Sequence, residues 1–246
     1  MLPKQRTLAL FVLGALALWP APVYAMHIGE GILPAPWAGL WFAISLPFVW
    51  WGLHDIQRRS KKRPYMKALV GLVGAAVFIV SCMPVPVPLV GTCSHPCGTG
   101  MAAILIGPLA TVVVSSVALL LQALFLAHGG LSTLGANICS MGVVGAFVGY
   151  GVFVVARRAG ASLFVAAFLA GLLSDWGTYA MTSFELASGL CGNDSLSQTF
   201  LAILVAFSPT QIPLGLAEGV VSGLACVFVC SRRPELMGLR AEGTSA

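Results

Sequence analysis

The chain has 246 residues, of which 58% are hydrophobic and only 9% are charged, and its formal net charge is +5. Soluble domains carry about 25% charged residues, so this composition excludes a water-soluble globular domain and predicts an all-α protein that crosses a membrane several times. The basic residues gather at the ends of apolar segments, a pattern that sets membrane orientation and argues against binding to nucleic acid.

Residues 1–25 have the pattern of a secretory signal peptide. Lys4 and Arg6 form a positively charged start, Leu8–Trp19 is an apolar run, and small residues precede a cleavage point after Ala25. The alternative is an uncleaved first membrane helix, although the apolar run is too short to span a bilayer comfortably. We therefore predict that a peptidase removes this leader.

Cleavage would leave one membrane domain over residues 26–233, followed by a cytoplasmic tail over residues 234–246. The apolar runs of this domain are predicted to be helices, because backbone groups in lipid must be hydrogen-bonded within their own segment. The sequence shows no strand alternation and no linker that would divide domains. The strongest predicted spans are Trp37–Leu53, Ala68–Met83, Leu109–Leu126, Ile138–Ala156, Leu163–Met181 and Ile212–Cys230.

The basic clusters predict how these spans are oriented. Arg58–Lys67 is the largest cluster and is expected on the cytoplasmic side. A cleaved leader would place Met26 outside, so the first span would run inward and deliver this cluster to the cytoplasm. The two signals therefore agree, and the loop that contains His95 is expected on the outer face.

The middle of the chain can be interpreted in two ways. A single helix over Met101–Leu126 would place the arginine pair at 157–158 outside. A break at Gly107-Pro108 returns that pair to the inside, and the charge rule favours this model. The segment Gly98–Ile106 would then reach only about 14 Å at 1.5 Å per residue, so it must be buried in protein. This model gives seven membrane segments, with the mature N-terminus outside and the C-terminus cytoplasmic.

A histidine directly follows the predicted cleavage point. Cleavage would leave Met26 with a free α-amine, and this amine, the His27 amide nitrogen and the His27 imidazole can fold around one ion as fused chelate rings. Planar nitrogen coordination suits Ni(II) or Cu(II), and low-spin cobalt is a reasonable extension. His95, in the loop GTCSHPCGTG, is the candidate fourth donor. A histidine near an interface can instead be an amphipathic end-cap, an interpretation that two histidines on one face weaken.

Polar residues near these candidate ligands are expected to support the metal-binding loops by hydrogen bonding. The turn HGGLSTLGAN places polar groups at membrane depth, where such groups are often functional, although ordinary helix-end hydrogen bonding is the alternative. Glu30 is interpreted as a solvated charge or a helix N-terminal residue. The supporting candidates are Thr92, Ser94, His128 and Asn137.

The seven cysteines do not form a disulfide framework, since most lie in apolar segments. Cys93 and Cys97 bracket His95 and have three interpretations: a site for a soft metal, an external disulfide, or two small loop residues. Asp175 and Glu185 are acidic residues at or beside a span, and they indicate either an ion path or paired, interfacial carboxylates.

Gly71 and Ala75 stand four residues apart in an apolar segment, a spacing of small residues that lets helices pack closely. They indicate either internal packing or a docking face for a partner. The sequence contains no P-loop, HExxH or GxSxG motif, so the chain is predicted not to hydrolyse ATP and not to be an enzyme.

Four ordered motifs, MHIGEGILP, GTCSHPCGTG, FLAHGGLSTLGANICSMG and SPTQIPLGLAEG, together resemble the CbiM/NikM family. Its members are substrate-capture components of energy-coupling-factor transporters for cobalt or nickel. The likeness extends from Met26 to about Arg233. It implies a six-helix substrate-binding core with one helix added before it, and a metal held by Met26, His27 and His95. Relatives often begin directly with Met-His, so the site in this chain would require cleavage of the leader.

The resemblance also implies the cargo and the partners. Co(II) would be the transported substrate, taken up through the cell inner membrane for cobalamin synthesis, with Ni(II) as the alternative and no prosthetic group. The partners would be a transmembrane coupling protein, an ATP-binding cassette subunit and, for cobalt, a small auxiliary membrane protein. Two other classes stay open: a membrane metal sensor or storage protein, and an intramembrane enzyme that uses His95 and Cys97.

Overall fold

The computed structural model of the protein describes residues 24–25, 27–83, 85–87 and 92–237, and the side chains of residues 24–25, 85–87 and 92–93 lie outside this description. Helices make up nearly all of it, which confirms the predicted all-α membrane fold. In chain order the helices are α2 (Ala35–Lys62), α3 (Met66–Ser81), α4 (Thr99–Ile106), α5 (Pro108–Phe125), α6 (Leu134–Asn137), the π-helix η1 (Ile138–Gly145), α7 (Ala146–Arg158), α8 (Leu163–Leu190), α9 (Leu196–Arg232) and the short 3-10 helix η2 (Pro234–Met237).

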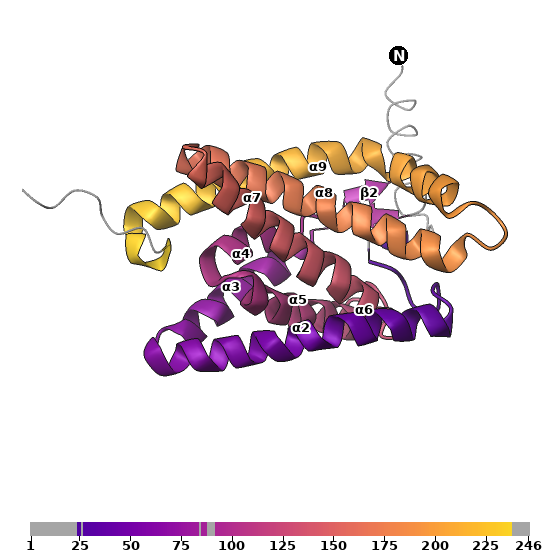
Figure 1. The fold of residues 1–246 in the computed structure, drawn as a ribbon, viewed down its shortest axis with the longest axis horizontal. Coiled ribbons are helices and arrows are strands. Elements are labelled where there is room, and N and C mark those ends of the chain that lie inside the picture. The colour runs from indigo at the N-terminus through magenta and orange to yellow at the C-terminus, as the bar shows by residue number, and fades with distance from the viewer. Residues whose placement is uncertain (1–23, 26, 84, 88–91, 238–246) are drawn as a thin grey trace, which may run out of the picture.

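Seven helical segments form the bundle within the described residues, since α6, η1 and α7 follow one another without a break. Four of them are long and apolar enough to cross a membrane by length and composition, namely α5, the continuous segment Leu134–Arg158, α8 and α9. Figure 1 shows the long helices lying roughly along one axis, with α2 on one side of the bundle, α8 and α9 on the other, and α4 between them. Large apolar side chains such as Leu72, Val205 and Phe228 are exposed on the outer faces, as contact with lipid requires.

Three helices, α2, α8 and α9, are each at least nine residues longer than the sequence analysis predicts, and proline explains the largest error. The last span was expected to start at Ile212, but α9 runs from Leu196 to Arg232 and contains Pro209 and Pro213 in its interior. Proline is tolerated inside a membrane helix because neighbouring helices and nearby hydroxyl groups form hydrogen bonds with the backbone groups that proline leaves unpaired. Similarly, α8 continues nine residues past its expected end at Met181.

The predicted break in the middle of the chain is confirmed. Gly107 separates α4 from α5 with φ +85° and ψ 156°, a conformation that L-residues rarely adopt, and Pro108 starts α5. The short helix α4 is buried along its length apart from a partly exposed Leu105, as we expected for a segment too short to span lipid. It packs against α3, α5, α7, α8 and α9. Its Gly100 lies so close to α8 that an added Cβ would stand 2.8 Å from the Ala170 carbonyl oxygen.

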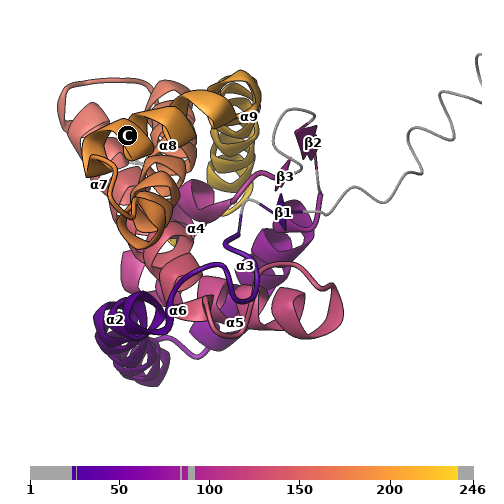
Figure 2. The ribbon, with the colours of Figure 1, turned by 90° about the vertical axis from the view of Figure 1, so that its right-hand side faces the viewer.

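A small three-stranded sheet, which the sequence analysis did not predict, lies at the side of the bundle, beside α9 and α3 (Figure 2). Its strands are β1 (Tyr24–Ala25), β2 (Val85–Val87) and β3 (Thr92–Ser94), in the order β1-β3-β2. β2 and β3 are antiparallel, whereas β1 is parallel to β3 and pairs Ala25 with Cys93. This parallel register brings two histidines close together, because His27 and His95 each follow a residue of the Ala25–Cys93 pair by two positions in the chain.

The basic residues gather at the end of the bundle that lies away from these two histidines. A pocket there is lined by Arg59 and Arg63 from the end of α2, Tyr150 of α7 and Leu236 of η2, so the chain segments that carry the three arginine-rich clusters meet at one end. Gly107 also lies there, since an added Cβ would stand 3.4 Å from an Arg59 guanidinium nitrogen. The molecule therefore has a basic end and a histidine-bearing end.

Candidate metal centre

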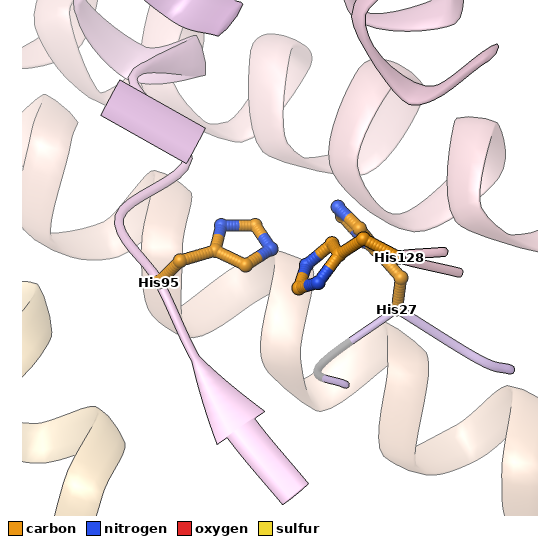
Figure 3. A group of neighbouring side chains, drawn as sticks. All are labelled: His27, His95 and His128. Atoms are coloured by element: carbon orange, nitrogen blue, oxygen red, sulfur yellow. The ribbon is translucent and has the colours of Figure 1, made fainter. Parts of the chain in front are cut away.

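Three histidines from distant parts of the chain converge beside the small sheet (Figure 3). His27 precedes α2, His95 follows β3, and His128 follows α5. The ring centroid of His27 lies 4.5 Å from that of His95 and 5.0 Å from that of His128, and the remaining pair is 5.1 Å apart. One ring nitrogen of each histidine lies within 4.8 Å of the others, a spacing compatible with a single metal ion. His27 and His95 are buried, and His128 is partly buried.

The segment after His27 is fixed to the loop that follows α5 by a set of hydrogen bonds. Asn137 accepts from the Ile28 amide at 2.8 Å and donates to the Ile28 carbonyl oxygen at 3.2 Å, and the Thr133 hydroxyl donates to the same oxygen at 2.5 Å. Asn137 therefore fixes the backbone next to His27, and its supporting role at a metal site stays a prediction.

Glu30 has a more defined role than the solvated charge that we expected. Its carboxylate accepts from the Ser132 amide at 3.1 Å, while the Ser132 hydroxyl accepts from the Gly31 amide at 3.2 Å. These side-chain and backbone bonds to Ser132 lower the pKa of the Glu30 carboxyl. Glu30 thus closes a reciprocal contact between the N-terminal segment and the loop that carries His128.

A single amide determines which nitrogen of His27 is available. Gln122 of α5 donates from Nε2 to the Ser81 hydroxyl at 2.8 Å, so its carbonyl oxygen faces His27 Nε2 at 3.1 Å. A carbonyl oxygen can only accept, so the proton of the neutral imidazole resides on Nε2 and the Nδ1 lone pair is available. Nδ1 is also the nitrogen that can join the backbone amide of the same residue in a chelate ring. Sequence reasoning missed Gln122, and its signal was a polar side chain inside an apolar span.

In His95 the other ring nitrogen carries the proton. Its Nδ1 donates to the Pro96 carbonyl oxygen at 3.1 Å, which leaves Nε2 as the acceptor nitrogen. That atom is buried and has no hydrogen-bond partner in the part of the chain that the structure describes. Buried polar atoms are normally paired, so an orphaned imidazole nitrogen beside two other histidines indicates a ligand position.

Burial makes all three imidazoles poor bases. It lowers the pKa of His27, His95 and His128, with a further contribution from the neighbouring imidazoles for His27 and His95, and the pKa of His95 falls to about 3. At neutral pH the rings are therefore uncharged, which is the form that binds a metal.

Helix α9 holds the His95 loop from the other side. The Ser94 hydroxyl accepts from Gln211 Nε2 at 2.9 Å and lies 3.3 Å from the Thr210 hydroxyl. Glu218, two turns further along α9, accepts from the Cys97 amide at 2.6 Å and the Gly98 amide at 2.9 Å. Ser94 thus contacts α9, and its role in supporting a metal site stays a prediction. The sequence analysis named neither Gln211 nor Glu218 as a site residue, although both stand in the SPTQIPLGLAEG motif.

The other residues that the sequence analysis singled out lie outside the described residues or differ from their predicted roles. Met26 and the side chains of Thr92 and Cys93 lie outside the described residues. Cys97 is a free thiol whose Sγ faces Asp175 of α8. His128, expected to support the site by hydrogen bonding, belongs to the histidine cluster itself.

The fold matches a solved crystal structure described as a transition metal transporter, with a TM-score of 0.73 and 24% sequence identity, over 85% of this chain and 94% of the other. At this identity the likeness concerns the fold alone. Together with the four helices that are long and apolar enough to cross a membrane, it identifies the chain as a multi-pass, all-helical membrane protein.

The family follows from the sequence. Residues 27–236 match the CbiM family model, described as the cobalt uptake substrate-specific transmembrane region, and the chain belongs to this family. A cobalt transport protein CbiM of Sorangium cellulosum is 58% identical over 212 residues, which cover 86% of this chain and 94% of that protein. The Geobacter sulfurreducens protein of the same name is 56% identical over 92% of this chain and 65% of its own greater length. The chain is thus a transport protein and not an enzyme.

Proposed function

We propose that the protein captures Co(II) at the outer face of the cell membrane, as the substrate-binding component of an ATP-driven uptake transporter. The observation that carries this proposal is the convergence of His27, His95 and His128 as buried, neutral imidazoles, with His27 Nδ1 and His95 Nε2 left available. Relatives named as cobalt transport proteins support cobalt as the cargo. Nickel is the alternative cargo, because nitrogen donors bind Ni(II) more tightly than Co(II) in the general affinity order.

In the proposed mature protein, the Met26 α-amine, the His27 amide and His27 Nδ1 would hold the ion on one side, and His95 Nε2 would supply a fourth nitrogen. Cleavage after Ala25 would remove β1. The hydrogen bonds from Asn137 and Thr133 to Ile28 would then retain the new N-terminus at the site. His128 lies close enough to act as a further donor or to restrict access of water to the ion.

The orientation and the partners belong to the same proposal. The basic end of the bundle would face the cytoplasm, because positive residues are retained on that side, and the histidine end would face outward. The nucleotide-hydrolysing subunit, a transmembrane coupling protein and a small auxiliary membrane protein would be separate chains. Gly71 and Ala75 line an apolar groove of about 400 Å³ between α3 and α5, which is suited to docking of the coupling protein. The imported cobalt would supply cobalamin synthesis.

The test uses three variants of the full chain, purified from membranes, with Co(II) and Ni(II) binding measured by equilibrium dialysis. We expect His27→Ala and His95→Ala each to lose the metal ion bound at the histidine centre, measured as a loss of one bound ion per chain. His54→Ala is the matched control, because His54 is exposed on α2 and its Nδ1 contacts only the Trp50 carbonyl oxygen of its own helix. Normal binding by either site variant would contradict the histidine centre.

The chelate itself is tested separately at the N-terminus. N-terminal sequencing of the membrane-inserted protein should give Met26 as the first residue. A variant with one residue added before Met26 in the mature protein should lose tight binding, because the amine is displaced from the site. Tight binding by the extended form would contradict the chelate and leave only the imidazoles as ligands.

A further inference from the structure

A second cluster of buried groups lies beside the histidine loop and takes no part in the histidine centre. Cys97 stands just before α4, Asp175 is on α8, and Glu218 is on α9. One ligand atom from each lies within 4.8 Å of the others. Cys97 and Asp175 are fully buried and Glu218 is 3% exposed.

This cluster contains a buried carboxylate oxygen that nothing in the described residues satisfies. Asp175 Oδ1 faces the Cys97 thiol at 3.9 Å, and Asp175 Oδ2 is buried without a hydrogen-bond partner. Oδ2 lies against α9 one turn before Glu218, since a Cβ added to Gly215 would stand 3.0 Å from it. Each Glu218 oxygen accepts one backbone amide from the start of α4, which leaves a further lone pair on each.

No basic side chain compensates the two carboxylates. The ion pairs found in the described ranges involve Asp55 and Glu235, and neither Asp175 nor Glu218 takes part in one. Two buried carboxyl groups and a thiol at this spacing are unfavourable without a cation or bound protons, because burial penalises the unpaired charge. The cluster therefore has the composition of a cation site.

The spacing fits a metal with a mixed donor set. Metal–sulfur and metal–oxygen bonds of about 2.3 and 2.0 Å in a tetrahedral zinc site place the sulfur and oxygen about 3.5 Å apart. The Cys97 and Asp175 atoms are 3.9 Å apart, so a shift of a few tenths of an ångström would let both contact one ion. Thiolate together with carboxylate oxygen suits Zn(II) and Co(II), whereas Mg(II) and Ca(II) prefer oxygen alone.

We propose that Cys97, Asp175 and Glu218 form a second metal site for a divalent cation of the Zn(II) and Co(II) type. Binding transfers the thiol proton to solvent, and the thiolate and one oxygen of each carboxylate bind the ion. The proposal goes beyond capture by the histidines and does not depend on it. It places a second set of ligands two residues from His95, on the side of the loop that faces α8 and α9.

The test is optical titration of the purified full-length protein with Co(II). A cobalt–thiolate bond gives a charge-transfer band in the near ultraviolet that imidazole and carboxylate ligands do not give. We expect this band in the wild-type protein, its loss in Cys97→Ser, and a loss of one bound Co(II) per chain in both Cys97→Ser and Asp175→Asn. Cys226→Ser is the matched control, since Cys226 is also a buried, free thiol but lies on α9 outside the cluster.

Two outcomes would overturn the proposal: no thiolate band in the wild-type protein, or a band that persists in Cys97→Ser. Loss of the band in Cys93→Ser instead would assign the thiolate to Cys93. The His27→Ala variant separates the two sites, because it should lose the histidine-bound metal and keep the band. Thermal unfolding with and without Zn(II) in that variant checks folding. We expect Zn(II) to raise its Tm, and to leave the Tm of the His27→Ala, Cys97→Ser double variant unchanged.

Discussion

The Gln122 side-chain amide determines which nitrogen of the His27 imidazole carries the proton, and it thereby leaves Nδ1 available to bind a metal. Replacing it in Gln122→Leu removes the acceptor for His27 Nε2 and the donor to Ser81. We expect Co(II) affinity to fall about 10- to 100-fold, as it does when the partner of a metal-binding histidine is lost. Equilibrium dialysis of the purified protein measures the change.

A control on the same helix tests whether the effect is specific. Ser116 donates only to the Val112 carbonyl oxygen within α5, so Ser116→Ala should leave the affinity unchanged. If Gln122→Leu loads cobalt as tightly as the wild-type protein, Gln122 does not select the nitrogen that binds the metal.

At this scale the sequence indicates the candidate ligands and some of the residues around them, such as Ser94 and Asn137, but not Gln122. His27 and His95 are uncommon side chains beside a predicted cleavage point and in a glycine-rich loop, so sequence alone indicates a metal. Gln122 lies in an otherwise apolar run whose periodicity says nothing about which polar group it will meet. Its role follows only from the approach of α5 to a segment 95 residues earlier in the chain.

At the scale of single elements, the junction between α4 and α5 depends on one backbone conformation. Gly107 has φ +85° and ψ 156°, a region that only glycine adopts readily, and the following proline favours the extended ψ. We expect Gly107→Ala to destabilise the protein by about 1–3 kcal/mol, measured as a lower Tm in detergent. The new methyl group would lie 3.4 Å from the flexible end of Arg59, so the expected loss comes from the backbone conformation and not from a clash.

Gly151→Ala is the matched control for this substitution. Gly151 lies within α7 and has no positive φ, and an added Cβ there would meet no atom within 4 Å. Alanine should therefore leave the Tm unchanged or raise it slightly, because it favours the helix more than glycine does. An unchanged Tm for Gly107→Ala would show that the junction does not require glycine.

Helix positions could largely be predicted from the sequence, whereas strand pairing could not. Apolar runs and the Gly107-Pro108 pair carry local information, so the spans and the break were found. The strands have only two or three residues each, too few for an alternating pattern. The pairing of Ala25 with Cys93 joins segments 68 positions apart, and that contact exists only in the folded chain.

For the whole molecule, the separation into a basic end and a histidine end predicts a labelling pattern in cells. Lys61 is exposed at the basic end of α2, and Asn193 is exposed in the loop between α8 and α9. In a Cys191→Ser parent, a membrane-impermeant maleimide should label Asn193→Cys in cells whose inner membrane is intact. It should label Lys61→Cys only after that membrane is permeabilised.

The parent protein without added cysteine gives the background signal from native thiols. Equal labelling of both positions in intact cells would mean that the two ends are not separated by the membrane. Labelling of Lys61→Cys alone would invert the proposed orientation, and the histidines would then open toward the cytoplasm.

The burial of α4 has a mechanical consequence for the whole molecule. This helix has only eight residues, about 12 Å at 1.5 Å per residue, and it is packed against five neighbouring helices. Such a rod is too short to bend and too enclosed to shift by itself. Because the His95 loop adjoins one end of this rod and the glycine beside Arg59 adjoins the other, we expect a rigid displacement of α4 to move both, with Gly98 at φ +68° lying between α4 and His95.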